Sequence, residues 1–437
     1  MKAILARLNR WSRWHYLALA LAFYLVAYGI EWARYDWNPS IVFHFGHYYV
    51  EQNPNWTPAG AIRLLGNEQH GGNGYDGQIF YYFARSLIEP GQWPRGFSMA
   101  YRAPRIALPL LTAPFALLGN QALVTGFYLV QMGLFLASLV CLLDLLPAER
   151  RYLGLLYIAS PFALRANLLM VTDSTALALV LIGLHFWSKA RPGPARLGGA
   201  WLAFSLAILA KESALFLLFP LGLWALVRLD LVKSFILVAS LLPMLVWQIY
   251  LREAQGMVPA NILGVFIAPL QGITGLGLEA LQIVTRSASP LALLLGLARL
   301  AARLLLVLIL LGSLILILGT RGPDAAWHWR LAAFFAALSI VFADHFYFWG
   351  VFDNIGRMFT MLLAALILWQ AEREQPISPL FGMLGLACLF LSSLLFLRMA
   401  FLTPVMPYDT WTNPVHEQSS GTRLRLDPLK PGLNPAL

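Results

Sequence analysis

The chain has 437 residues, of which 59% are hydrophobic and only 12% are charged. Soluble domains carry about 25% charged residues, so this composition excludes a single large soluble core and predicts an all-α, polytopic membrane protein. The net charge of +10 does not indicate nucleic-acid binding, because much of it lies in short segments beside apolar runs, where it orients helices and contacts anionic lipid.

Apolar runs of near membrane-spanning length predict eleven transmembrane helices. Leu123 to Leu143 and Leu380 to Leu397 approach the roughly 20 residues that cross a bilayer, and their residue types favour helices over a barrel. No small-residue cleavage site follows the first run, so we expect it to be retained. The expected helices are 15–33, 121–146, 151–169, 173–189, 197–210, 213–228, 232–252, 298–319, 328–346, 356–371 and 379–401. Residues 1–401 are interpreted as one membrane domain.

Basic residues predict the orientation of these helices. Lys2, Arg7, Arg10 and Arg13 precede the first helix, and every second helix boundary after it is basic. Because Lys and Arg favour the cytoplasmic side, we expect the N-terminus inside and the C-terminus outside. The outer side then holds a large first loop, residues 34–120, and a polar, Pro-rich tail, residues 402–437.

Two short helices are expected in the outer loop. In "GGNGYDGQIFYYFARSL", Asp76 precedes an aromatic pattern of helical spacing that suits the membrane surface, and its flanking glycines would let the backbone approach a substrate. The GxGxxG pattern in this stretch lacks the strand and βαβ unit of a dinucleotide site. Arg105 to Gly119 is apolar but too short and Pro-broken to span, so we expect it in the outer interface.

Ionisable side chains inside apolar segments are costly and are therefore functional candidates. Nine such residues, far apart in the chain, all fall on the predicted outer side. They are Asp76, Arg102, Arg105, Asp173, Lys211, Glu212, Asp344, Asp353 and Arg357. The pattern predicts one shared outer site.

Simpler interpretations of these residues stay open. Asp76 and Asp173 stand where each could cap the following helix, and Asp353 and Arg357 have the i,i+4 spacing of a simple ion pair. A mutual pair of the neighbours Lys211 and Glu212 is less favoured, because adjacent helical residues do not face each other; the lysine could instead neutralise a phosphate.

The remaining polar and aromatic candidates carry weaker signals. Most aromatic residues of the outer loop suit an interfacial belt, while a few are candidates for contact with a sugar or lipid. These are Tyr75, Gln78, Tyr82 and Tyr101. His44 and His47 have helical spacing, but no further ligand completes a zinc set.

The segments "YDGQIFYYFA", "YRAPRIALPLL" and "KESALFLLFP", with an acid opening the fourth helix, resemble the GT-C class of integral-membrane glycosyltransferases. The closest likeness is to bacterial cell-surface glycopolymer formation proteins, and the first segment also looks like the "WD…F…IA" loop of the mannosyltransferases that build glycolipid anchors. The resemblance covers roughly residues 30–370 in order of features and is specific at 74–109.

The resemblance implies a GT-C-like fold in a bacterial inner membrane, with a site facing the periplasm. It implies sugar transfer with inversion from a polyprenyl-phosphate donor to an envelope acceptor, with Asp76 as base. By motif, Lys211 and Glu212 match a recurrent K-E joint, and Arg357 matches the arginine of the last conserved outer segment. No cofactor is certain; this chain lacks the adjacent second acid of two-acid members, so a divalent metal is left open.

The polar residues suit that chemistry. Asp76 can take the proton of an acceptor hydroxyl. Arg102, Arg105, Asp173, Lys211, Glu212 and Arg357 are expected around the donor phosphate, where the cations would stabilise its growing negative charge. A lipid-linked sugar flippase or other transporter, or a non-catalytic component of envelope polysaccharide assembly, is the alternative; transporters place charges near the bilayer midplane.

Overall fold

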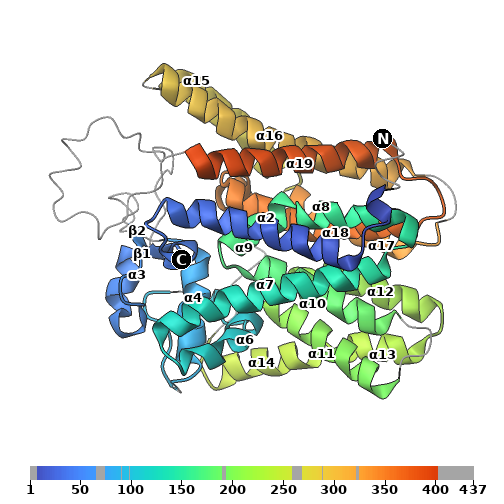
Figure 1. The fold of residues 1–437 in the computed structure, drawn as a ribbon, viewed down its shortest axis with the longest axis horizontal. Helices are drawn as coiled ribbons and strands as arrows, with labels where there is room; N and C mark the ends of the chain where they lie inside the picture. Colours follow the sequence, from blue (N-terminus) through green and yellow to red (C-terminus); the bar gives the residue numbers. More distant parts are fainter. Residues whose placement is uncertain are drawn as a thin grey trace.

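Long helices run side by side along the longest axis of the molecule, and short elements of the first loop gather at one end (Figure 1). The computed structural model describes residues 7–64, 74–89, 91–97, 99–188, 193–257, 268–287, 289–320 and 324–401. The predicted tail, 402–437, lies outside the described residues. The protein is all-α: the strands described are only β1 (Phe45–Gly46) and β2 (Arg63–Leu64), which pair in parallel.

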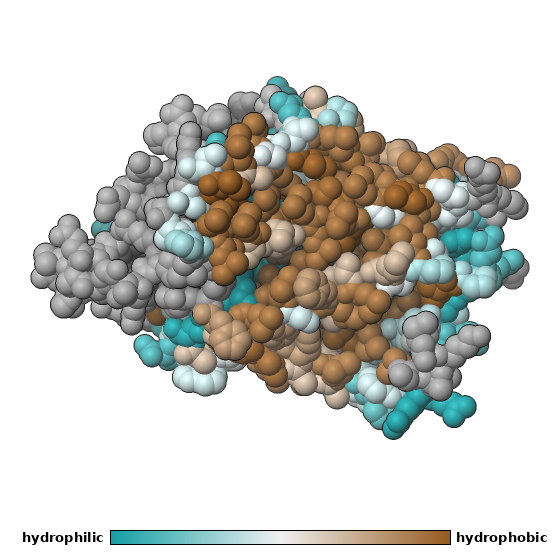
Figure 2. All heavy atoms as spheres, turned by 90° about the horizontal axis from the view of Figure 1, so that it is seen from above, coloured by the Kyte–Doolittle hydropathy of each residue, from teal (hydrophilic) through white to brown (hydrophobic). Residues whose placement is uncertain are grey.

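Six described helical stretches are long and apolar enough to cross a membrane. They are α2 (Arg13–Ala33), α7 (Asn120–Leu145), α13 (Leu231–Ala239) continued by α14 (Leu242–Glu253), α16 (Pro290–Gly319), α18 (Phe352–Glu372) and α19 (Pro379–Phe401). Hydrophobic residues cover the middle of one face and hydrophilic residues lie toward its ends, which is the surface of a membrane protein (Figure 2).

Shorter apolar helices complete the bundle. They are α6 (Ala107–Ala116), α10 (Thr172–Trp187), α11 (Pro194–Ala210), α12 (Leu215–Val227) and α17 (Trp327–Val341). Four of these helices match predicted spans but are shorter than the six stretches above. The predicted number of eleven membrane crossings therefore stays a prediction. The fifth, α6, has 10 residues, about 15 Å at 1.5 Å per residue, half the thickness of a bilayer core. It is therefore too short to span, as expected.

Most of the remaining elements are short helices. In the first loop they are η1 (Pro39–Phe43), α3 (His47–Gln52), η2 (Pro54–Trp56), α4 (Asp76–Ser86) and α5 (Met99–Arg102). Farther along the chain they are η3 (Ala148–Leu153), α8 (Gly154–Ile158), α9 (Pro161–Leu168), η4 (Glu212–Ala214) and the π-helix η6 (His345–Trp349). The amphipathic helix α15 (Gln271–Arg286) lies in a stretch predicted as a loop.

Two predicted helices are interrupted, each for a local reason. The expected helix 151–169 is divided at Ser160, whose hydroxyl caps α9 by accepting from Ala163 N at 3.2 Å, with Pro161 in the first turn. The expected helix 232–252 is divided between α13 and α14, where Pro243 lies in the first turn of α14. Proline cannot donate the backbone hydrogen bond that would continue the preceding helix.

A stripe of tyrosines joins the first helix to the rest of the bundle. Every fourth residue of α2 from Tyr16 to Tyr28 is buried, the spacing of one helical face. Tyr28 packs edge-on against Tyr128 of α7 at 5.0 Å between ring centroids. The Tyr128 hydroxyl donates to the carbonyl of Pro39 at 2.7 Å, so Tyr128 also fixes η1 of the first loop.

The helix α4 is buried, and the expectation that it lies on the membrane surface is wrong. Nine of its 11 residues are buried, because it packs between α6, α7 and η1. Its aromatic residues form the core of the first-loop elements; the rings of Tyr81 and Phe43, for example, meet at 5.2 Å. Burial on several sides fixes the position of its first residue, Asp76.

Candidate functional site

Charged side chains from α4, α5, α10, α18 and the joint after α11 meet in one cluster. Arg102 Nη2 donates to Asp76 Oδ1 at 3.2 Å. Arg357 lies between two carboxylates, 3.7 Å from Asp76 Oδ2 and 3.7 Å from Asp173 Oδ2. Lys211 Nζ donates to Asp173 Oδ1. The structure thus brings together residues that are up to 281 positions apart.

The two residues of the K-E joint take different partners. Lys211 has extended backbone between α11 and η4, so its side chain and that of Glu212 diverge. Glu212 accepts from Arg105 Nε at 3.0 Å and also from its Nη2, while Lys211 binds Asp173. A mutual Lys211–Glu212 pair is not formed, in agreement with the expected geometry.

A third group of ion pairs was not predicted. Asp353 accepts from Arg165 Nε and Nη2 at 2.7 and 3.0 Å, and Arg398 lies 3.6 Å away. Arg165 belongs to an apolar predicted helix, so the rule on ionisable residues in apolar segments would have found it. The ion pair that the spacing of Asp353 and Arg357 left open is not formed: Arg357 Nε donates to the backbone carbonyl of Asp353 at 3.2 Å, and its Nη2 donates to Asn354 Oδ1 at 3.0 Å.

The capping interpretations of Asp76 and Asp173 are wrong, and a cap that was not predicted is formed by Asp344. The α4 helix begins at Asp76 after Tyr75, and α10 begins at Thr172 after Val171, both without a side-chain cap. Asp344, however, caps η6 by accepting from Tyr347 N at 2.8 Å. Asp76 and Asp173 therefore use their carboxylates in the cluster, whereas Asp344 has a local role.

The four predicted sugar or lipid contacts divide into two pairs. Tyr75 and Tyr101 border the cluster: the Tyr75 hydroxyl donates to Asn354, and Arg105 lies over the Tyr101 ring at 4.7 Å. Gln78 and Tyr82 are fully buried. Gln78 Oε1 accepts from Gly46 N at 2.8 Å, and the Tyr82 hydroxyl shares a hydrogen bond with Thr57 at 2.7 Å. Both brace the first loop, so the substrate contact predicted for them is not supported.

The glycines around Asp76 serve close packing within the protein. A Cβ on Gly77 would lie 2.3 Å from the carbonyl oxygen of Leu169, and one on Gly74, where φ is +61°, would lie 2.0 Å from that of His44. A side chain at either position would displace the start of α4. The expectation that these glycines admit a substrate is therefore replaced by a role in positioning Asp76.

Neighbouring arginines keep Asp76 and Glu212 ionised. Burial raises the pKa of Asp76, but the guanidinium groups of Arg102 and Arg357 outweigh it, and the pKa lies below its usual value. Burial also raises the pKa of Glu212, but the Arg105 guanidinium outweighs this effect, and the pKa is lowered to about 2. At neutral pH both side chains are therefore carboxylates.

Positive charge exceeds negative charge in the cluster. Its ion pairs contain the cations Arg102, Lys211 and Arg357 and the acids Asp76 and Asp173, a surplus of one positive charge. In the neighbouring groups Arg105 is balanced by Glu212, and Asp353 has Arg165 and Arg398, of which Arg398 is 47% exposed. Buried charge is costly unless it is paired, so this surplus favours an anionic ligand.

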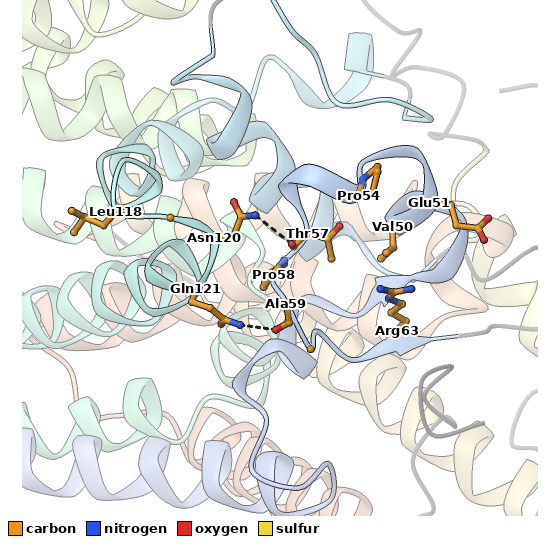
Figure 3. Close-up of a pocket in the computed structure, with 12 residues that line it drawn as sticks. Val50, Glu51, Pro54, Thr57, Pro58, Ala59, Arg63, Leu118, Asn120 and Gln121 are labelled. Atoms are coloured by element: carbon orange, nitrogen blue, oxygen red, sulfur yellow. Dashed lines mark hydrogen bonds between the residues drawn. The ribbon is translucent and has the colours of Figure 1, made fainter. Parts of the chain in front are cut away.

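A separate hollow of about 700 Å³ lies near the other end of α4, against the start of α7 (Figure 3). Gln121 Nε2 donates to the carbonyl of Ala59 at 2.7 Å and Asn120 Nδ2 to that of Thr57 at 3.3 Å. Arg85 Nε donates to Asn120 Oδ1 at 3.1 Å. These bonds brace the first loop on α7, and no residue of the charge cluster lines the hollow.

His44 and His47, which have helical spacing in the sequence, lie in different environments. His47 Nε2 lies 3.1 Å from Glu51 on α3, while His44 precedes β1. Among the residues that the structure describes, no three His, Cys, Asp or Glu side chains group as metal ligands. The donor set therefore offers no metal site within those residues.

Comparisons with known proteins do not identify a family for this chain. No protein-family model, curated protein or solved structure matches the chain. Function is therefore argued from the charge cluster, its accessible carboxylate and its surplus of positive charge.

Proposed function

We propose that the protein is a GT-C-like glycosyltransferase of the bacterial inner membrane that moves a sugar from a polyprenyl-phosphate donor to an envelope acceptor on the outer face. The observation that carries the proposal is the cluster of three cations and two carboxylates around Asp76 and Asp173, because its surplus of positive charge suits a phosphate. The membrane-length helices support a donor that is held by its lipid.

Asp76 is the proposed base. Its side chain is 28% exposed, so an acceptor can reach it. Oδ1 is bonded to Arg102, whereas Oδ2 lies 3.7 Å from Arg357 Nη2, beyond hydrogen-bond distance. Oδ2 is therefore the oxygen that can take a proton from an acceptor hydroxyl.

The proposed transfer is one displacement at the anomeric carbon. The acceptor oxygen bonds to that carbon while its proton passes to Asp76 Oδ2, and the bond from the anomeric carbon to the phosphate oxygen breaks. Polyprenyl phosphate leaves with the electron pair, and Lys211 and Arg357 stabilise the added negative charge. One base and no covalent intermediate give inversion at the anomeric carbon.

The variant Asp76→Asn tests this function. Asparagine keeps the size of the side chain but cannot act as a base, so transfer from polyprenyl-phosphate sugars by the purified protein should fall by about a hundredfold or more. Asp344→Asn is the matched control, since Asp344 caps η6 outside the cluster and asparagine also caps well. Equal turnover of Asp76→Asn and wild type would refute the base and favour a transporter or a non-catalytic component.

A further inference from the structure

A buried arginine of α16 bonds to the segment that leads into the charge cluster. Arg303 is only 4% exposed within a 30-residue apolar helix. Its Nη1 donates to Glu279 Oε2 of α15 at 2.6 Å, and its Nη2 donates to the other carboxylate oxygen. A charge inside an apolar helix is expensive, so a pair of this kind calls for a reason beyond helix packing.

The same guanidinium also reaches two backbone carbonyls. Arg303 Nη1 lies 3.3 Å from the carbonyl oxygen of Trp349 and 3.1 Å from that of Gly350. These residues end η6, and α18 begins at Phe352. The last carbonyls of a helix lack intrahelical partners, so Arg303 satisfies them where the chain turns into α18.

The α15 helix closes the other side of this turn. His345 Nδ1 is 3.0 Å from the carbonyl oxygen of Gly272, and its Nε2 is 3.8 Å from Glu279 Oε2. Contact is close because the facing residues are glycines: a Cβ on Gly272 would lie 2.1 Å from the carbonyl oxygen of Ala343, and one on Gly275 would lie 2.4 Å from the His345 ring.

The turn thus held carries the cluster residues of α18. The first turns of α18 contain Asp353, Asn354 and Arg357, which bind Arg165, Tyr75 and the two carboxylates Asp76 and Asp173. We propose that Arg303 and Glu279 are positioning residues, which anchor the junction of η6 and α18 and so fix Arg357 against the two acids. The effect of this anchor on transfer rests on the proposed function; the anchor itself does not.

Hydrogen–deuterium exchange of the full-length protein in detergent tests the anchor without any activity. In Arg303→Lys the charge stays, but the ammonium group lacks the planar fork that bonds the carboxylate and both carbonyls together. Amides of residues 350–357 should then exchange about tenfold faster, the change for one lost bond to a charged group, while those of α7 stay unchanged. Arg330→Lys is the matched control, because Arg330 Nε donates to the carbonyl of Ile317 at 2.7 Å, between α17 and α16.

The exchanged pair Arg303→Glu with Glu279→Arg separates anchoring from simple pairing. It restores opposite charges between α15 and α16, but a carboxylate at 303 cannot donate to the carbonyls. Fast amide exchange at residues 350–357 should therefore persist in this double variant. Unchanged exchange in Arg303→Lys, or full recovery in the exchanged pair, would overturn the proposal; if Arg303→Lys does not fold, Glu279→Gln serves, and normal exchange at 350–357 in it would overturn the proposal equally.

The transfer assay then tests the consequence. Arg303→Lys should lower kcat more than it raises the donor KM, because Arg303 touches no substrate and acts through Arg357. A wild-type protein that transfers no sugar contradicts the proposed function and leaves the exchange result standing. Active wild type with equal kcat in Arg303→Lys would refute the positioning role in transfer.

Discussion

Removal of Arg165 should destabilise the protein more than removal of any single exposed charge. The Arg165 and Asp353 side chains are 11% and 14% exposed and share bonds of 2.7 and 3.0 Å. Loss of one partner from a buried pair costs about 3–5 kcal/mol, because the other charge stays buried. Arg398, 3.6 Å from Asp353 and 47% exposed, compensates in part, so we expect about 3 kcal/mol for Arg165→Met.

A double-mutant cycle measures the pair itself. Arg165→Met and Asp353→Asn should each destabilise the protein, and the double variant should be more stable than the sum of the two losses predicts by about 2 kcal/mol. Unfolding by sodium dodecyl sulfate in mixed micelles, followed by the fluorescence of the 15 tryptophans, gives these free energies.

An exposed pair provides the control for that cycle. Arg252 and Glu253 lie 3.3 Å apart but are 73% and 70% exposed, so Arg252→Met should cost less than about 1 kcal/mol. If the free energy of unfolding of Arg165→Met lay within about 1 kcal/mol of wild type, solvent would screen the Arg165–Asp353 pair more than its burial indicates, and the reasoning would be refuted.

Two further outcomes follow from the geometry around Asp76. Because its pKa is lower in the folded protein than the usual 3.8, its contribution to stability is present above that value and is lost as the pH falls through the folded pKa. The pH–rate profile of transfer should therefore show no acidic loss due to Asp76 between about pH 8 and pH 5; a limb near pH 6 that shifts to another pH in Asp76→Glu, whose carboxylate also titrates, would contradict this. Gly77→Ala should destabilise by about 1–3 kcal/mol, because its Cβ would lie 2.3 Å from the Leu169 carbonyl oxygen. Gly133→Ala in α7, where no atom lies within 4 Å of the new Cβ, should be neutral or stabilising. Equal effects of the two glycine variants in the unfolding assay would exclude close packing as the cause.

Hydrophobic length predicted the long helices but could not show where they break. Periodicity detects an apolar face; it does not register that Ser160 offers a better cap than a continued helix, or that Pro243 removes a backbone donor. The α15 helix was missed because Gly272, Gly275 and Gly277 lower its intrinsic helix propensity, and two of these glycines are required by contact with η6.

The members of the site could be predicted better than their pairing. The cost of charge in apolar segments identified Asp76, Asp173, Lys211 and Arg357 from their positions alone. The choice of partner depends on backbone directions at helix ends, such as the extended residue Lys211, and no spacing rule contains that information. Arg303 also lies in an apolar predicted helix, so the same rule would have found it, but its bonds to Glu279 and to two backbone carbonyls follow from no spacing in the sequence.

The surplus positive charge of the cluster has a kinetic consequence under the proposed reaction. A polyprenyl-phosphate sugar is a phosphodiester with one negative charge, whereas the polyprenyl phosphate left after transfer carries between one and two at neutral pH. A cluster with surplus positive charge would hold the spent carrier more tightly than the fresh donor. Turnover would then be limited by departure of the carrier lipid, and free polyprenyl phosphate would act as a competitive inhibitor that weakens as ionic strength rises.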